Sequence, residues 1–293
     1  MQPTQSPLED SSRNPVNSSL RRILCLLAGA TMLLTACAST HERSSQKLYD
    51  AWRTGASLPL AHNIDETLTI ESAYRVQRDL VRRRLAGARP AGFKAGLTSP
   101  PSQARFHAAG PIAGVLPVPP SQTPAVLHLS KLRGLNIETE VALRVSMPIR
   151  QRLADVNEMK QHVDGIAAAI ELPNLDYTTP AQLTALDIIA SNVAAAYFLV
   201  GEFESPQRRD PNAAAPRLTC AGKEVNAGQA RDALGDQWQA ALWLVNTMVE
   251  QGWSIEPGQI LMTGALGRMV PAQPGHCIAS YGDWGTLEVN VAE

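Results

Sequence analysis

The sequence predicts an α+β protein, because segments with the two-residue period of strands and segments with the 3.6-residue period of helices both occur along its 293 residues. Residues 136–145 alternate between apolar and polar side chains, as a half-buried strand does. Residues 164–172 are nearly all small or apolar, which is typical of a strand covered on both faces. Residues 237–251 place apolar side chains at helical spacing and end at Gly252. With 44% hydrophobic and 18% charged residues, the chain can bury a core around such elements.

Residues 1–37 have the layout of a disordered lead followed by an export signal. Arg21 and Arg22 precede a short apolar segment, residues 23–34, and small residues follow it. The apolar segment is too short to span a hydrocarbon core of about 30 Å as a helix. A permanent transmembrane anchor is therefore not expected.

The motif Leu34-Thr-Ala-Cys37 resembles a bacterial lipoprotein box, in which the cysteine becomes the lipidated first residue of the mature chain. With Ala38 next, the resemblance implies a membrane anchor at Cys37 and an outer-membrane location facing the periplasm. An ordinary secretory signal and a misassigned start codon ahead of a cytosolic enzyme are the alternatives. After removal of the signal, Cys220 and Cys277 remain, and a single disulfide between them is left open.

Residue patterns also predict the helices, strands and loops of residues 38–293. Residues 38–90 are expected to form a polar tether, residues 38–45, and N-terminal helices ahead of a larger domain, residues 91–293. The expected helices are residues 46–53, 69–86, 102–108, 155–162, 179–189 and 237–251. The expected strands are residues 92–98, 136–145, 164–172, 259–263, 276–281 and 286–291, with a hairpin at 218–225. The Pro-rich residues 111–124 and the polar residues 204–216 are expected to be loops.

The helix at 69–86 has Thr69 as its expected cap and Gly87 as its stop. Arg82, Arg83 and Arg84 are interpreted as its solvated side.

Three glutamates are the candidate metal ligands. On a strand at 136–145, Glu138 and Glu140 point to the same side with Cα atoms roughly 6.5–7 Å apart, close enough to converge on one ion. A solvated strand face would explain the same pattern. However, Glu171 ends the apolar strand at 164–172, where a charge needs a partner. Hard cations such as Mg²⁺ take oxygen ligands and keep open positions for substrate, so the set favours substrate chelation.

Lys94 lies between apolar neighbours in a strand-like run with two glycines, Gly92 and Gly96. It is either a lysine that extends to the surface or a functional group. In the functional interpretation, burial lowers its pKa and makes it a proton shuttle or a contact for a substrate carboxylate. Gly264 and Gly267, in turn, either bring backbone amides near an anion or form a turn.

Over about residues 66–291 the chain resembles the 2-keto-4-pentenoate hydratases of the fumarylacetoacetate hydrolase superfamily. Five blocks carry the resemblance in order: Gly92-Phe-Lys-Ala-Gly-Leu-Thr-Ser99, Ile137-Glu-Thr-Glu-Val-Ala142, Ala169-Ile-Glu-Leu-Pro173, Asp187-Ile-Ile-Ala-Ser-Asn192 and Gly258-Gln-Ile-Leu-Met-Thr-Gly-Ala-Leu-Gly267. The resemblance implies a mixed β-roll with flanking helices, homo-oligomerisation, and a Mg²⁺ or Mn²⁺ site at Glu138, Glu140 and Glu171. It implies a hydro-lyase of aromatic-compound catabolism that hydrates a 2-hydroxy-2,4-dienoate to a 4-hydroxy-2-oxo acid, with Lys94 as catalytic residue.

Ser99, Asn192 and Thr263 are weaker candidates for contacts with the 2-oxo acid substrate. Two departures from the family pattern bear on this substrate. Ala190-Ser191-Asn192 stands where the family has Ala-Asp-Asn, and Asn174-Leu-Asp-Tyr177 replaces an Asp-Ser-Arg type segment, so a cationic carboxylate contact is missing there.

Three other functions stay open. A 2-oxo-3-enedioate decarboxylase and an acylpyruvate hydrolase share the architecture, and a non-catalytic envelope lipoprotein on the same fold is the alternative from another class. The formal net charge of −1 gives no basic surface for nucleic acid.

Overall fold

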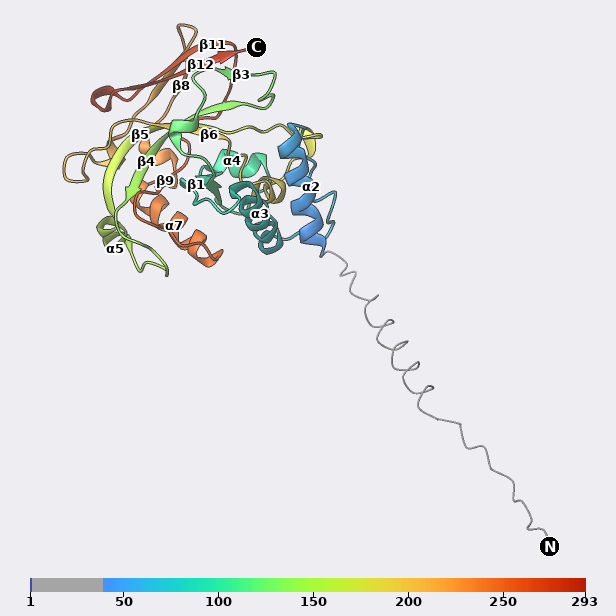
Figure 1. The fold of residues 1–293 in the computed structure, drawn as a ribbon. Coiled ribbons are helices and arrows are strands. Elements are labelled where there is room, and N and C mark those ends of the chain that lie inside the picture. The colour runs from blue at the N-terminus through green and yellow to red at the C-terminus, as the bar shows by residue number, and fades with distance from the viewer. Residues whose placement is uncertain (2–38) are drawn as a thin grey trace. The chain divides into compact units, whose positions relative to one another are not determined.

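The computed structural model describes Met1 and residues 39–293, so the export signal and Cys37 lie outside the described residues. Thr40–Glu293 form one compact unit. Two sheets and a set of helices build it, which confirms the expected α+β class (Figure 1).

The larger sheet has seven strands in the order β2-β1-β9-β4-β5-β6, with β10 added to β4. Its strands are β1 (Gly92–Gly96), β2 (Ile112–Leu116), β4 (Asn136–Val145), β5 (Val163–Leu172), β6 (Tyr197–Val200), β9 (Ile260–Met262) and β10 (Val270–Pro271). The β1–β9 pair is parallel and the other pairs are antiparallel, so the sheet is mixed.

The smaller sheet has five strands in the order β3-β12-β11-β7-β8. These are β3 (Leu127–His128), β7 (Arg217–Cys220), β8 (Lys223–Ala227), β11 (Gly275–Ser280) and β12 (Thr286–Ala292). The hairpin predicted around Ala221-Gly222 is β7–β8, and the predicted C-terminal strands are β9, β11 and β12.

The α-helices of the described residues are α2 (Thr40–Thr54), α3 (Ile70–Leu85), α4 (Pro100–Arg105), α5 (Val156–Gln161), α6 (Ala185–Ala190) and α7 (Gln237–Glu250). Single 3₁₀ turns are η1 (Pro120–Gln122), η2 (Pro180–Gln182), η3 (Pro211–Ala213), η4 (Ala230–Asp232) and η5 (Gly282–Trp284). Thr69 caps α3 as predicted, because its hydroxyl accepts a hydrogen bond from the backbone N–H of Ser72.

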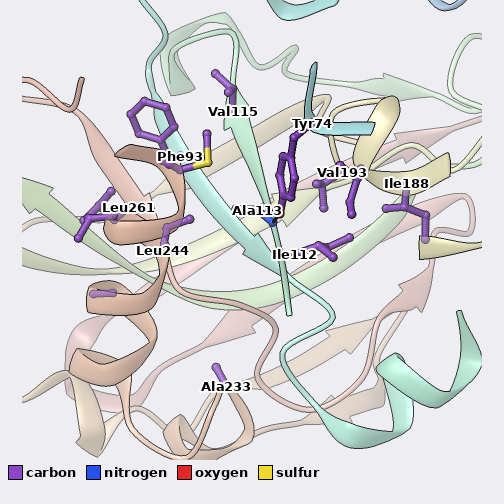
Figure 2. Close-up of a cluster of buried hydrophobic side chains, with 14 of the residues drawn as sticks. Tyr74, Phe93, Ile112, Ala113, Val115, Ile188, Val193, Ala233, Leu244 and Leu261 are labelled. Atoms are coloured by element: carbon purple, nitrogen blue, oxygen red, sulfur yellow. Dashed lines mark hydrogen bonds between the residues drawn. The ribbon is translucent and has the colours of Figure 1, made fainter. Parts of the chain in front are cut away.

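One face of the larger sheet is covered in two parts (Figure 1). Ile137 of β4 and Ile170 of β5 pack against the smaller sheet. Farther along β4, Val141 and Leu143 pack instead in a core with α3 and α7. Figure 2 shows part of this core around β1 and β2, with Tyr74, Phe93 and Leu244 among its residues. The sheet therefore curls from one partner layer to the next, which agrees with the β-roll.

Buried hydrogen bonds join α3 to the sheet and to α6. The Tyr74 hydroxyl accepts from the backbone N–H of Ala113 at 2.9 Å, and these residues lie side by side in Figure 2. The Gln77 amide donates to the backbone carbonyls of Ala113 and Ile189, each at 2.9 Å. These bonds fix the helices over β2.

Four local predictions were wrong. The expected tether is helical from Thr40, and Ser44 and Ser45 are buried. The expected Pro-rich loop contains strand β2, because the apolar run Ile112–Leu116 pairs with β1 despite its flanking prolines. The single helix expected at 179–189 is split into η2 and α6, with Thr184 as a new N-cap. Finally, Arg84 is half-buried and stacks over the Trp52 ring at 4.8 Å, whereas Arg82 and Arg83 are exposed as expected.

Cys220 and Cys277 form a disulfide between the paired strands β7 and β11. The bond closes a loop across a sequence separation of 57 residues, and such loops contribute about 2–4 kcal/mol. The double variant Cys220→Ser, Cys277→Ser is expected to lose about this much free energy of unfolding in urea denaturation. A reducing agent should destabilise the wild type and leave the double variant unchanged. Two free thiols in the native, oxidised protein would contradict the pairing.

Candidate metal centre

Strand register brings the three predicted glutamates together. Glu138 on β4 is directly paired with Glu171 on β5, and Glu140 lies two residues along β4 on the same face. Ala142, Ala167 and Met262 continue that face as a small apolar cluster. The carboxylates thus project from the face opposite to the core of Figure 2.

The cluster has the chemistry of a site for a hard divalent cation. One carboxylate oxygen from each glutamate lies within 4.8 Å of the others. Glu140 Oε1 and Glu171 Oε2 are buried and have no hydrogen-bond partner. A buried anionic oxygen without a partner is costly, and a cation bound between the carboxylates removes that cost. The residues present therefore fit a divalent metal held through oxygen ligands.

A backbone N–H outside the strands holds the Glu140 side chain in place. Its Oε2 accepts a hydrogen bond from the backbone N–H of Gly264 at 2.9 Å. Gly264 has φ 114°, and a Cβ there would lie 2.5 Å from the Thr98 side chain, so glycine is required. The amides of both glycines therefore approach carboxylates, because that of Gly267 donates to Asp232 at 2.9 Å.

Tyr281 was not anticipated from the sequence. Its hydroxyl accepts from the backbone N–H of Glu140 at 3.0 Å and donates to the backbone carbonyl of Ala169 at 2.5 Å. It thus fixes β4 and β5 next to the carboxylates. No local pattern marks a buried tyrosine for such a contact, because its partners are more than a hundred residues away in the chain.

Lys94 is buried, with 2% of its surface exposed, so the surface-lysine interpretation was wrong. Its ammonium pairs with Glu171 Oε1 and donates to the backbone carbonyl of Val193 at 3.0 Å. Burial by itself lowers the pKa of Lys94, but the charges of Glu171, Glu138 and Glu140 outweigh it and raise the pKa above its usual value. The expected lowering of the pKa was therefore wrong, because the carboxylates surround the ammonium.

Burial and crowding raise the pKa values of two of the glutamates. Burial is the largest cause for Glu138, and together with the charge of Glu171 it raises the pKa to about 7 against the opposing effect of Lys94. The pKa of Glu140 is raised well above its usual value, first by burial and then by the charges of Glu171 and Glu138. Without a cation, both carboxyls therefore keep their protons to a higher pH than an ordinary glutamate does.

The raised pKa of Glu138 predicts that rising pH destabilises the metal-free protein and increases the stabilisation that metal gives. The folded state keeps a proton on Glu138 between the ordinary pKa of about 4.5 and about 7, where the unfolded chain has lost it. Metal-free protein is therefore expected to lose stability across this range, on the order of 3 kcal/mol from this group. Stabilisation by Mg²⁺ should instead grow with pH, since the metal displaces these protons.

The measurement is urea denaturation from pH 5 to pH 8, in EDTA and in saturating Mg²⁺. Glu138→Gln is the reference for all other titrating groups. A wild-type curve parallel to that of Glu138→Gln in EDTA would contradict the assigned pKa.

A cavity of about 800 Å³ adjoins the cluster. Of the three glutamates, only Glu138 lines it, and Glu140 and Glu171 are buried behind the surface. The segment from β1 to α4 forms another part of its wall, and residues of β8, of η4 and of the segment 265–269 form the rest. Its volume lies in the range of small-molecule sites, about 300–1,000 Å³.

The three residues that were predicted as weaker candidates for substrate contacts lie in different places. Ser99 lines the cavity. Asn192 is buried, and its side chain pairs with the backbone N–H and carbonyl of Val115, each at 2.8 Å. Thr263 is also buried, and its hydroxyl bonds to Gln237 and to the backbone carbonyl of Val141. Only Ser99 therefore shares the cavity wall with Glu138.

The fold is that of the fumarylacetoacetate hydrolase superfamily. 4-Oxalocrotonate decarboxylase from Pseudomonas putida G7, solved in complex with magnesium and adipate, superposes with a TM-score of 0.77 at 24% identity over 85% of this chain and 96% of that one. This likeness shows the β-roll predicted from the sequence. No family model matches the chain.

Relatives identified by sequence define the family of the chain more closely than its fold does. 2-Keto-4-pentenoate hydratase 1 of Dechloromonas aromatica (strain RCB) is 30% identical over 210 residues, covering 70% of this chain and 79% of the relative. 2-Keto-4-pentenoate hydratase of Paraburkholderia xenovorans (strain LB400) is 27% identical over 237 residues, covering 80% and 88%. The chain belongs to the 2-keto-4-pentenoate hydratase family.

Proposed function

We propose that the protein catalyses the divalent-metal-dependent hydration of a 2-hydroxy-2,4-dienoate to a 4-hydroxy-2-oxo acid. The observation that carries the proposal is the glutamate cluster beside a cavity, with two buried carboxylate oxygens that lack partners. Membership in a family whose curated relatives are named hydratases supports the reaction class.

Glu138, Glu140 and Glu171 would hold Mg²⁺ or Mn²⁺. When bound, the cation would supply Lewis-acid stabilisation for the negative charge that develops on the 2-oxo acid end of the substrate. Glu138 faces the cavity, so substrate oxygens approach the cluster from its side. Lys94 keeps its proton at neutral pH and lies against Glu171, so it supplies a positive charge and a proton at the buried side of the cluster.

The reaction consumes one water. The water hydroxyl is added at C4, C3 and C5 each gain a hydrogen, and the 2-hydroxyl loses its proton to become the 2-oxo group. Proton transfer at carbon therefore accompanies the change from enol to ketone, which is where groups such as Lys94 act.

The test is to incubate the purified full chain, in detergent, with 2-hydroxypenta-2,4-dienoate, a 2-oxo-3-enedioate and an acylpyruvate in parallel. The expected result is Mg²⁺-dependent loss of dienoate absorbance with formation of the 4-hydroxy-2-oxo acid. Release of CO₂ from the enedioate alone would favour a decarboxylase, and turnover of the acylpyruvate alone would favour a hydrolase. Turnover of none would overturn the enzyme assignment.

We also propose that Cys37 carries a lipid anchor in the cell envelope. The lipoprotein-like motif at Cys37 supports this, and the Cys220–Cys277 disulfide fits an oxidising compartment. Among the residues that the structure describes, no helix is long and apolar enough to cross a membrane. Labelled palmitate is expected to be incorporated into the wild type and not into Cys37→Ser. Equal labelling of the two would contradict the anchor.

A further inference from the structure

Three arginines line the cavity that Glu138 faces, and the proposed chemistry at the metal does not use them. They are Arg105 at the end of α4, Arg231 in η4 and Arg268 beyond β9. They come from three separate segments of the chain, so the fold alone brings them to one cavity. None of the five sequence blocks that carry the family resemblance contains any of them.

These three arginines are among those of the described residues that form no ion pair with a carboxylate, and Arg105 stacks over the Phe106 ring at 5.0 Å. Seven arginines among the described residues, such as Arg133 and Arg144, form ion pairs with carboxylates. Within the same part of the chain, Arg105, Arg231 and Arg268 form none. Arg268 donates to the backbone carbonyl of Val225, at 3.1 Å from Nε and 2.7 Å from Nη2. Its remaining guanidinium nitrogen stays available for an anion.

The acidic residues of the cavity wall do not neutralise the charge of the three arginines. Glu138 belongs to the metal cluster. Asp232 is the other acid, and its Oδ2 accepts from the backbone N–H groups of Gln229 at 2.7 Å and Gly267 at 2.9 Å. The cavity therefore has a negative end at the metal cluster and an excess of positive charge elsewhere on its wall.

The cavity is also larger than a short dienoate needs. A five-carbon acid chelated at the metal leaves most of about 800 Å³ unfilled. Apolar side chains such as Leu97, Phe106 and Met269 also line the cavity, beside polar ones such as Ser99. A ligand that matches this wall has a chelating 2-oxo acid at one end, a short carbon chain, and an anionic group at the other end.

We propose that the substrate is a dicarboxylate, and that Arg105, Arg231 and Arg268 bind its distal carboxylate. This inference rests on the proposed function, because it assumes that the 2-oxo acid end lies at the glutamates. Guanidinium groups bind carboxylates through paired N–H donors, which makes them suited to this role.

The test uses two unreactive ligands of equal length, 2-oxoheptanedioate and 2-oxoheptanoate. Calorimetry on the full chain with saturating Mg²⁺ is expected to give about tenfold or tighter binding for the diacid. Arg231→Gln combined with Arg268→Gln should remove this preference and leave monoacid binding unchanged. Arg217→Gln, at an exposed ion pair on β7, is the matched control and should keep the preference.

The outcomes separate the two proposals. If the ligands bind equally well to the wild type, or if the double variant weakens both to the same extent, the distal site is wrong while the 2-oxo acid assignment stands. If neither ligand binds, both fail. A preference for the diacid that survives in the double variant would also overturn the assignment of the arginines, and so would a loss of the preference in the Arg217→Gln control.

Discussion

Glu140→Gln is expected to reduce divalent-metal affinity about 100-fold or more and to abolish turnover. Groups that only orient metal ligands are worth about 10- to 100-fold, and Glu140 is a candidate ligand itself. Glutamine preserves the shape of the side chain and an oxygen that accepts from the Gly264 N–H, so the fold is retained. Calorimetric titration with Mg²⁺ and Mn²⁺ measures the loss.

The same variant is expected to be more stable than the wild type without metal at pH 8, on the order of 1 kcal/mol. Burial and the neighbouring glutamates raise the pKa of Glu140, so ionising it there costs free energy that glutamine does not pay. Asp164→Asn is the control, because Asp164 lies on β5 with Glu171 but is exposed and pairs with Arg144 at 2.8 Å. Unchanged metal binding in Glu140→Gln, or an equal loss in Asp164→Asn, would contradict the site.

The glutamate cluster could be predicted from the sequence because it depends on strand geometry. An alternation of period two fixes Glu138 and Glu140 on one face, and β4 has the predicted bounds. Placing Glu171 opposite Glu138 needed the register of two strands, which the sequence pattern alone does not give. Glu171 was grouped with the other two because a charge at the end of an apolar strand needs a partner, and the family resemblance implied the same set.

Other parts of the site depend on contacts between distant segments, which no local pattern encodes. Tyr281 reaches Glu140 from the smaller sheet, and the pairing of Lys94 with Glu171 reversed the expected direction of its pKa shift. The three cavity arginines gave no signal, because exposed arginines are common and their convergence is a property of the fold. Strand β2 was missed because flanking prolines dominated the interpretation of an edge strand.

Lys94→Met is expected to separate stability, metal binding and catalysis. Without metal, the variant should lose about 3–5 kcal/mol of unfolding free energy, because Glu171 is left buried near two other carboxyls without its cationic partner. Metal affinity should rise, because the ammonium no longer competes with the cation for Glu171. Turnover should fall about 100-fold or more, the usual loss when a group that transfers protons is removed.

Urea denaturation in EDTA, calorimetry with Mg²⁺ and turnover in saturating Mg²⁺ measure the three effects, with the exposed Lys223→Met as control. All turnover assays are made on metal-loaded protein, so a variant that unfolds without metal is still informative. Loss of turnover with intact metal binding assigns Lys94 to the chemistry. Normal turnover would limit Lys94 to balancing the charge of Glu171, and weaker metal binding would show that its positive charge supports the glutamate cluster rather than competing for it.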